Sequence, residues 1–404
     1  MPNIYLDHNA TAPVRPEVRN AVAEALSGEY GNPSSIHRPG HRAKILLESA
    51  RASVARLLGA RSHEILFTSG GTEANNLALL GAAAKRGDRG HVIVSRVEHS
   101  SVLEPARALE RQGLRISRIP PSPAGRVDPD QVLRAVTSDT FLVSLMHSSN
   151  ELGTLQPVEE VACGLSGRGV LLHTDAVQSA GKVPLNVHRI GVDLLSLSAH
   201  KIGGPQGVGC LWIRDSVTLA PLLLGGAQET YRRAGTEPLP LIAGFGVAAT
   251  LADEELPSAT AIRELRDWLE EEMGRRFENV RFHGRAAARV PNTLSAAFPG
   301  TGGEEMVMAL DLEGVSVSTG SACAAGTVRP SHVLEAIGCS REEARATLRI
   351  SLGRGSSRAE LEGFMSALAR VLDRSRGGFA RGASERDSRS AAQAVTVLGK
   401  SRRA

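Results

Sequence analysis

The chain has 404 residues, 42% of them hydrophobic and 22% charged, with 42 glycines and 20 prolines. This composition is typical of a globular protein with many tight turns, and the length suits a large α/β domain with a smaller one, or two comparable domains. The formal charge is +4, but residues 374–404 alone carry a net +6 and leave −2 for the rest, which argues against a nucleic-acid-binding domain.

The N-terminus and the cysteines indicate a cytoplasmic protein. Residues 1–16 (MPNIYLDHNATAPVRP) lack a basic stretch followed by an apolar one, and no run approaches about 18 consecutive apolar residues. The four cysteines do not form a disulfide scaffold and show no zinc-type spacing, so we expect a reducing compartment and no metal site.

Short aliphatic runs alternate with helical stretches from residue 64 to residue 214. The runs span residues 64–68, 91–95, 114–119, 141–147, 170–176, 193–198 and 209–214, and the helical stretches include 72–87 and 157–169. This alternation predicts an α/β fold with a mostly parallel sheet covered by helices on both faces. In such a sheet, ligands bind beyond the carboxyl ends of the strands.

The pattern changes after residues 237–246 (EPLPLIAGFG). A helix with Ile262, Leu265, Leu269 and Met273 on one face comes first. It is followed by strands over 280–284 and 292–299, a helix from Gly303, a strand over 315–320, a glycine-bounded loop, a strand over 347–353 and a helix from about residue 358. We therefore expect residues 1–15 to pack with a smaller α+β domain at 256–376, a large α/β domain at 16–255, and a disordered basic tail at 377–404.

Residues 67–76 (FTSGGTEANN) predict a strand, a glycine-rich turn and the start of a helix. Backbone N–H groups at a helix N-terminus, with Gly71 and the Thr72 hydroxyl, suit a phosphate, although a plain tight turn explains the pattern equally well. The segment has no Gly-Lys-Ser/Thr sequence, which excludes a P-loop for nucleoside triphosphates.

Three polar residues follow predicted strands. Asp175 at the end of its strand is either a cap or turn residue, or a carboxylate that pairs with a pyridinium nitrogen; Gln178 follows it. His99 is either a surface histidine or a site residue.

Lys201 is the most informative residue. It lies in residues 196–207 (SLSAHKIGGPQG), among small residues, directly after a predicted buried strand. Burial lowers the pKa of a lysine, and the neutral amine is the form that makes a Schiff base. A phosphate turn, an acidic residue and this lysine, in that chain order, together suggest pyridoxal phosphate.

The chain resembles the class V aminotransferases and, within them, the cysteine desulfurases of the NifS/IscS kind. The resemblance covers about residues 3–372 and is carried by segments such as 4–18 (IYLDHNATAPVRPEV), 31–43 (GNPSSIHRPGHRA), 145–158 (LMHSSNELGTLQPV), 172–185 (LHTDAVQSAGKVPL), 195–214 (LSLSAHKIGGPQGVGCLWIR) and 318–338 (STGSACAAGTVRPSHVLEAIG). It implies the pyridoxal-phosphate fold of type I, like aspartate aminotransferase, in a homodimer. The implied reaction converts L-cysteine to L-alanine and passes the sulfur to an acceptor protein.

The resemblance also implies residue roles. Lys201 would carry the cofactor and move the substrate Cα proton, His99 would stack on the ring and handle the thiol proton, and Cys323 would be the acceptor thiolate in its glycine-flanked loop. The cofactor ring would be held by Asp175 and Gln178, the phosphate by Gly71, Thr72, Ser198, His200 and Thr236 of the partner subunit, and the substrate carboxylate by Asn150 and Arg349. We expect Cys163, Cys210 and Cys339 to be structural.

Some residues depart from the family pattern. Relatives usually have asparagine at the position of Ser149 and often hydroxyl residues at those of Ala324 and Ala325, and an arginine-rich tail replaces their aromatic C-terminus. The acceptor therefore stays open between an iron-sulfur scaffold, a tRNA-thiolation relay and another pathway. A selenocysteine lyase or another class V enzyme is the alternative. A catalytically silent subunit is a third hypothesis, which predicts the loss of Lys201 or Cys323, yet both residues are present.

Overall fold

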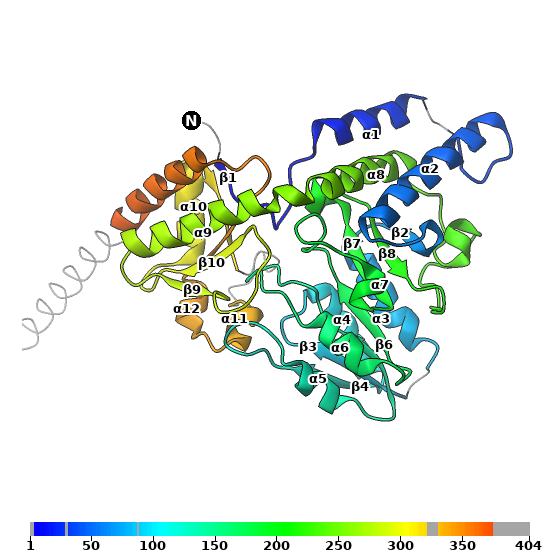
Figure 1. Cartoon of the computed structure of the whole chain (residues 1–404), viewed down its shortest axis with the longest axis horizontal. Coiled ribbons are helices and arrows are strands. Elements are labelled where there is room, and N and C mark those ends of the chain that lie inside the picture. The colour runs from blue at the N-terminus through cyan, green and yellow to red at the C-terminus, as the bar shows by residue number, and fades with distance from the viewer. Residues whose placement is uncertain (1–3, 29–30, 87–88, 321–329, 375–404) are drawn as a thin grey trace, which may run out of the picture.

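The computed structural model describes residues 4–28, 31–86, 89–320 and 330–374. The described residues form a larger and a smaller group of helices and strands that lie side by side (Figure 1). Two helices that follow one another, α8 (Leu239–Glu254) and α9 (Ala259–Arg276), lead from the larger group to the smaller one (Figure 1). None of the helices in the described ranges combines the length and the apolar character needed to cross a bilayer.

The larger group is built on a seven-stranded sheet. Its strands, in spatial order, are β2 (Ile65–Thr68), β8 (Gly209–Ile213), β7 (Leu194–Ser198), β6 (Leu171–Asp175), β5 (Thr140–Ser144), β3 (His91–Ser95) and β4 (Arg115–Ile119). Only the pairings that involve β8 are antiparallel. The predicted mostly parallel sheet is confirmed, and its carboxyl ends gather at one edge.

Helices cover both faces of this sheet. On one face, α2 (Arg38–Leu57), α6 (Val158–Leu165) and α8 contribute to one aliphatic core; on the other, α3 (Gly71–Ala83) and α4 (Ser100–Arg111) contribute to a second. The remaining helices and turns of this group are α1 (Pro16–Gly28), η1 (Ser62–Glu64), α5 (Pro129–Ala135), α7 (Val187–Ile190), η2 (Ala199–Ile202), η3 (Gln228–Tyr231) and η4 (Leu256–Ser258). Burial of both faces explains why these strands read as unbroken apolar runs.

The smaller group is built on an antiparallel sheet. Its strands, in spatial order, are β12 (Ser318–Thr319), β13 (Thr347–Ser351), β10 (Thr293–Ala297) and β9 (Arg281–His283). Three helices contribute to its core, namely α9, α10 (Gly303–Leu312) and the helix at residues 358–374, and α11 (His332–Ala336) and α12 (Arg341–Arg345) complete the group. The predicted α+β arrangement after α8 is therefore present.

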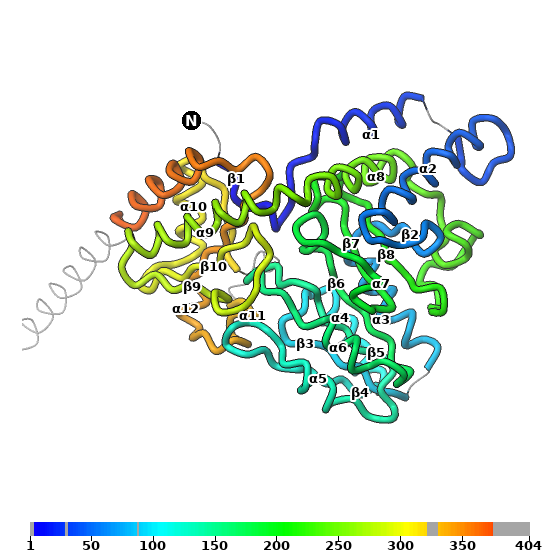
Figure 2. Tube along the Cα trace, in the orientation of Figure 1, coloured from blue at the N-terminus to red at the C-terminus, as the bar shows by residue number. Residues whose placement is uncertain are grey.

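The strand expected over residues 315–320 is wrong as one element. The chain forms β11 (Val315–Ser316), which pairs in parallel with β1 (Ile4–Tyr5), and then β12, which pairs with β13. The hydrogen-bonding partner changes at Val317 from β1 to β13, because the N-terminal strand β1 pairs with β11. From β1 the N-terminal segment crosses to α1 on the larger group, so it runs along both groups (Figure 2). The predicted boundaries at residues 15, 255 and 376 stay predictions.

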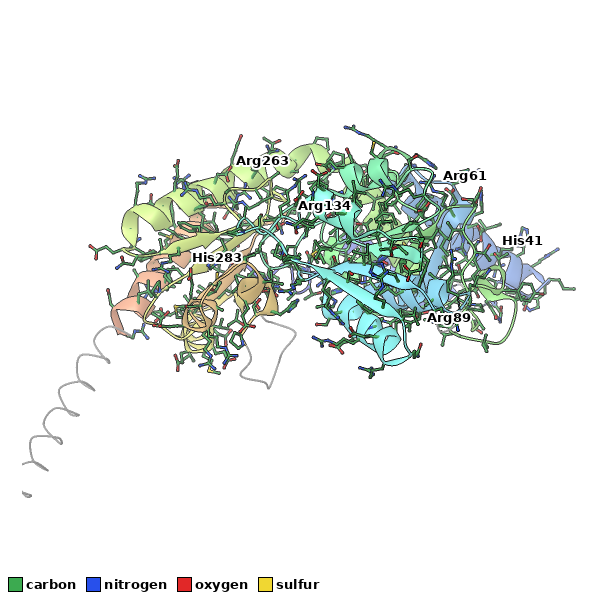
Figure 3. All side chains as sticks on the ribbon, turned by 90° about the horizontal axis from the view of Figure 1, so that it is seen from below. His41, Arg61, Arg89, Arg134, Arg263 and His283 are labelled. Atoms are coloured by element: carbon green, nitrogen blue, oxygen red, sulfur yellow. The ribbon has the colours of Figure 1, made fainter. Side chains whose placement is uncertain are left out.

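A buried ion pair holds the segment after β8 against β2. Arg51 makes two hydrogen bonds of 2.8 Å with the Glu229 carboxylate, which also accepts the Phe67 N–H at 3.1 Å. Glu229, Thr230 and Tyr231 all have positive φ, a conformation that costs a non-glycine residue about 1 kcal/mol or more. The pair therefore compensates for local strain at a buried position. Arg61 and His41, by contrast, are exposed at the surface of the larger group (Figure 3).

We expect Glu229→Gln to lower the free energy of unfolding by about 3 kcal/mol, because it leaves the buried Arg51 charge with only the half-exposed Glu48 as a counter-ion. Urea unfolding followed by circular dichroism measures this loss. Glu104→Gln removes an exposed partner of Arg107 and should leave the urea midpoint unchanged. Equal midpoints for Glu229→Gln and the wild type would contradict the assignment.

Candidate active site

Lys201 and Asp175 lie at the carboxyl edge of the large sheet. Asp175 is the last residue of β6 and is paired in register with Ser196 of β7, while Lys201 lies in η2, directly after β7. Gly203, with φ of 78°, ends η2 in the left-handed region, which a glycine adopts without strain. The parallel pairing of β6 and β7 thus brings the two residues to the same end of the sheet.

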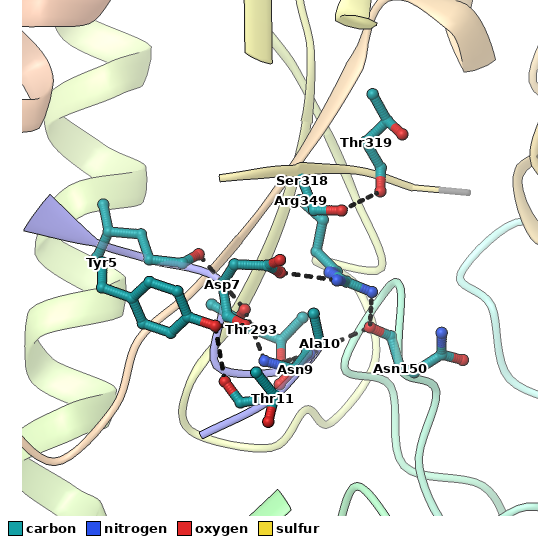
Figure 4. Close-up of polar contacts among 12 residues, drawn as sticks. Tyr5, Asp7, Asn9, Ala10, Thr11, Asn150, Thr293, Ser318, Thr319 and Arg349 are labelled. Carbon is teal, nitrogen blue, oxygen red and sulfur yellow. Dashed lines mark hydrogen bonds and ion pairs between the residues drawn. The ribbon is translucent and has the colours of Figure 1, made fainter. Parts of the chain in front are cut away.

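Asn9 of the N-terminal segment connects the larger group to the smaller one. Its side chain is buried and donates hydrogen bonds to the Thr293 hydroxyl at 2.9 Å and the Asn150 carbonyl at 3.1 Å (Figure 4). Its backbone carbonyl accepts from Lys201 Nζ at 2.6 Å and from Gln178 Nε2 at 2.9 Å. One buried residue therefore positions the predicted cofactor lysine and its neighbour Gln178.

A relay of hydrogen bonds joins Asp175 to His99. Asn75 Nδ2 on α3 donates to Asp175 Oδ2 and to the Ser101 hydroxyl oxygen, each at 2.8 Å. The Ser101 hydroxyl is 2.7 Å from His99 Nδ1, and the Ser101 N–H donates to the same nitrogen at 3.1 Å. Because Nδ1 is the acceptor, the neutral ring carries its proton on Nε2.

The glycine turn before α3 packs closely on the ends of its neighbours. A Cβ at Gly71 would lie 2.8 Å from the Val177 side chain and 3.6 Å from that of Ser198, so only glycine fits without a shift. The hydroxyl groups of Thr72 and Ser198 have no hydrogen-bond partner within the described residues. Glycine backbone, a helix N-terminus and two available hydroxyls suit a phosphate group.

The other predicted phosphate ligands lie in different surroundings. His200 Nδ1 is 3.2 Å from the Thr11 hydroxyl, and burial, followed by the Lys201 charge, lowers the His200 pKa to about 4, so its ring is neutral near pH 7. Thr236 is exposed, and its hydroxyl makes no hydrogen bond to any other residue that the structure describes. Cys323 lies outside the described residues.

Arg349 provides a charged group on β13, an inner strand of the smaller sheet. Its guanidinium is buried, donates to Asp7 Oδ1 at 2.8 Å and reaches the Asn150 carbonyl at 3.4 Å (Figure 4). Its Nε has no hydrogen-bond partner in the described residues. Since a buried N–H group without a partner is costly, this nitrogen suits a carboxylate that the protein itself does not supply.

Two buried carboxyl groups near the site were missed by sequence reasoning. Glu98 Oε1 accepts from the Ser95 hydroxyl at 2.6 Å and the Met146 N–H at 2.8 Å, and burial raises the Glu98 pKa to about 8. Burial also raises the Glu151 pKa to about 7, although the Ser331 hydroxyl donates to it. Glu98 is therefore mostly protonated at neutral pH, next to the site histidine in sequence.

Asn9, Asn75 and Lys182 were also missed. Asn75 gives the clearest signal, a polar side chain in a segment rich in small and apolar residues, 72–80 (TEANNLALL). That signal alone does not tell a site residue from a helix-surface residue, since only the tertiary fold shows that Asn75 faces Asp175.

Two groups of potential metal ligands lie in the described residues, and neither contains a predicted site residue. They are His283, Cys339 and Glu343, and His63, Glu64 and Asp215. Hydrogen bonds and ion pairs account for both, with His283 at 3.2 Å from Glu343 and Arg61 at 2.9 Å from Glu64. Cys163, Cys210 and Cys339 are free thiols, and Cys210 is buried in β8.

The family model for aminotransferase class-V matches residues 4–364. Cysteine desulfurase IscS of Dictyoglomus turgidum is 44% identical over 378 residues, which cover 92% of this chain and 95% of that protein. A solved NifS-like protein superposes with a TM-score of 0.86 at 35% identity and covers 92% of this chain and 99% of its own. A structure of SspA in complex with cysteine gives a TM-score of 0.76 at 36% identity, with 86% and 98% of the two chains covered.

We expect Glu98→Gln to change the pH dependence of stability. The pKa of Glu98 is about 8 in the folded chain and near 4.5 when unfolded, so folding favours its protonated form. Its contribution is complete below pH 4.5 and is lost as pH rises through 8. The urea midpoint of the wild type should therefore fall, relative to Glu98→Gln, between pH 5 and pH 8. The exposed control Glu335→Gln should track the wild type at every pH, whereas a Glu98→Gln difference that is constant with pH would contradict the buried protonated state.

Proposed function

The chain belongs to the class V aminotransferase family and, within it, to the cysteine desulfurases, and on this premise we propose that it converts L-cysteine to L-alanine and takes up the sulfur as a persulfide on Cys323. The observation that carries the proposal is the set of hydrogen bonds around Asn9, which accepts from Lys201 and donates to the Asn150 carbonyl that Arg349 also reaches. Asp175 lies on the same edge of the large sheet as Lys201, because β6 pairs in parallel with β7. A lysine amine, a buried carboxylate and a guanidinium with a free N–H are the groups that an amino-acid substrate and a pyridine cofactor require.

Pyridoxal phosphate is the cofactor of this family, and the residues present fit it. Asp175, fixed by Asn75 and by the Val177 N–H at 3.0 Å, would pair with the ring nitrogen, and Gln178 would donate to the ring oxygen. The phosphate would be held by Gly71, Thr72, Ser198, His200 and Thr236 of the partner subunit in a homodimer. When bound, the cofactor supplies an electron sink that makes the substrate Cα proton acidic and its C–S bond labile.

The chain's own residues would bind the substrate and move its protons. Arg349 Nε would hold the substrate carboxylate together with Asn150, while Asp7 keeps the guanidinium in place from its other side. Lys201 Nζ would move the Cα proton. His99 would present its Nε2–H to the substrate sulfur, because Ser101 occupies the other ring nitrogen.

Cys323 would complete the transfer as a thiolate. Its Sγ attacks the substrate sulfur, so an S–S bond forms while the C–S bond breaks. The carbon fragment keeps the electron pair of that bond, takes up a proton and leaves as alanine. Cysteine and the enzyme thiol thus become alanine and the enzyme persulfide with no external oxidant or reductant.

The acceptor of the persulfide sulfur would be a protein of iron-sulfur cluster assembly or a tRNA-thiolation relay. The alternative, a selenocysteine lyase or another class V enzyme, is disfavoured by Cys323, because simple transamination requires no thiol. It predicts turnover that does not depend on that cysteine.

The test supplies L-cysteine and follows alanine release together with added sulfur mass on the Cys323 peptide. Lys201→Ala should lower alanine release by about 1,000-fold or more, because it removes the amine that carries cofactor and proton. Cys323→Ser should abolish the persulfide. The exposed Cys163→Ser is the matched control and should behave as the wild type. Equal alanine release from Cys323→Ser and the wild type would overturn the proposed sulfur transfer.

Arg349→Lys should raise the KM for L-cysteine about 30-fold with a smaller change in kcat, since it replaces a planar fork by a point charge and loses one charge-assisted hydrogen bond of about 2 kcal/mol. Steady-state alanine formation measures both constants. Arg345→Lys, an exposed arginine four residues earlier, should leave both unchanged. An unchanged KM in Arg349→Lys would remove Arg349 from substrate binding.

A further inference from the structure

Lys182 is a second lysine beside the site, and neither the sequence motifs nor the proposed mechanism gives it a role. It follows Gln178 by one helical turn's spacing in the segment after β6, and its Nζ donates to Gln178 Oε1 at 2.8 Å and Asn9 Oδ1 at 3.0 Å. No carboxylate is among its partners in the described part of the chain. An ammonium group satisfied by amide oxygens alone is costly to bury, which requires a compensating role or a strong structural reason.

The Lys182 contact decides which way the Gln178 amide faces. An ammonium group has donors and no acceptor, so it requires the amide oxygen and places the amide NH2 on the opposite side. On that side, Gln178 Nε2 donates to the Asn9 carbonyl at 2.9 Å, which also accepts from Lys201 Nζ at 2.6 Å. A flipped amide would set NH2 against ammonium and carbonyl against carbonyl. Lys182 therefore keeps the donor end of Gln178 beside Lys201.

Lys182 and Lys201 are also coupled as charges. Both are hydrogen-bonded to Asn9, one at its side chain and one at its backbone carbonyl. Burial, followed by the charges of Lys201 and Arg349, lowers the Lys182 pKa to about 7. Because such coupling is reciprocal, a charge on Lys182 disfavours a charge on Lys201.

We propose that Lys182 is a positioning residue of the active site, which holds the Gln178 amide with its donor toward the ring oxygen of pyridoxal phosphate. This inference rests on the proposed function. The Gln178 donor on the ring oxygen and the nearby Lys182 charge would both stabilise the unprotonated state of the nitrogen by which Lys201 holds the cofactor. Lys182 thus favours the reactive neutral nitrogen of Lys201 without touching the substrate.

Other charged groups surround Lys182, and the test must leave them unchanged. Three of them lie on other segments of the chain and interact with it or with its neighbours: Lys201, Arg349 and His8. Lys182 also lines a cavity of about 890 Å³, and the charged residues that share this lining are Asp253, Arg263, Arg266, Arg285 and Arg289. Burial and then the Lys182 charge lower the His8 pKa to about 4, so His8 is neutral near pH 7. Asp7 neutralises Arg349.

The test is a pH titration of the absorbance of bound pyridoxal phosphate in the loaded enzyme. Lys182→Met should raise the titration midpoint by about one pH unit, because it removes both the charge and the donor to Gln178. Lys182→Gln removes the charge but keeps a donor for Gln178 Oε1, so it should raise the titration midpoint less than Lys182→Met does. Lys44→Met removes an exposed lysine charge on α2 and should leave the midpoint at the wild-type value.

A double-mutant cycle with Gln178→Ala identifies the route. If Lys182 acts through Gln178, Lys182→Met adds less to the midpoint in the Gln178→Ala background than in the wild type. Wild-type midpoints in both Lys182→Met and Lys182→Gln, or strictly additive effects, would overturn the proposal even if the variants unfold more easily. If the wild type makes alanine and Lys182→Met has the wild-type absorbance midpoint, the role of Lys182 is refuted while the proposed function stands. A wild type that binds no pyridoxal phosphate defeats the proposed function with it.

Discussion

The site depends on the hydrogen bonds of one buried residue, Asn9. Its segment pairs with the smaller group through β1 and β11, and its side chain contacts Thr293 of the smaller sheet and the backbone of Asn150 from the larger group. The backbone carbonyl of the same residue receives Lys201. A relative shift of the two groups would therefore displace the lysine, because a carbonyl with two donors in a dry environment is costly to separate from them.

The sequence predicts the large sheet well because its strands are buried on both faces. β3 occupies residues 91–95 as expected, and β7 ends just before the segment that carries Lys201. Prediction fails where pairing depends on a distant partner: residues 315–320 read as one strand, yet β1, more than 300 residues earlier, takes β11 away from the sheet that β12 joins. Apolar periodicity reports burial but does not identify the neighbour.

In the candidate site, too, some residues can be predicted from the sequence and others only from the tertiary fold. Asp175 and Lys201 could be selected from the sequence because Asp175 ends an apolar strand and Lys201 follows one, and strand ends in a parallel sheet share an edge. Asn75, Asn9 and Lys182 could not, since each acts through a polar group that another segment supplies. His99 Nδ1 is an acceptor only because Ser101 donates to it, which neither the spacing of the two residues nor a family resemblance determines.

Lys201 and Lys182 also show how the partner, rather than the residue type, decides what a lysine does. Both are kept beside Asn9, Lys182 at its side chain and Lys201 at its backbone carbonyl. Lys182 meets two side-chain amide oxygens, which fit an ammonium group and orient the amides in turn. Lys201 meets two backbone carbonyls, Asn9 and Ala10, which cannot reorient to follow it. Lys201 can therefore move to a cofactor and return, because its two carbonyl partners stay in place. If Lys182 moved away, the Gln178 and Asn9 amides would lose the contact that orients them.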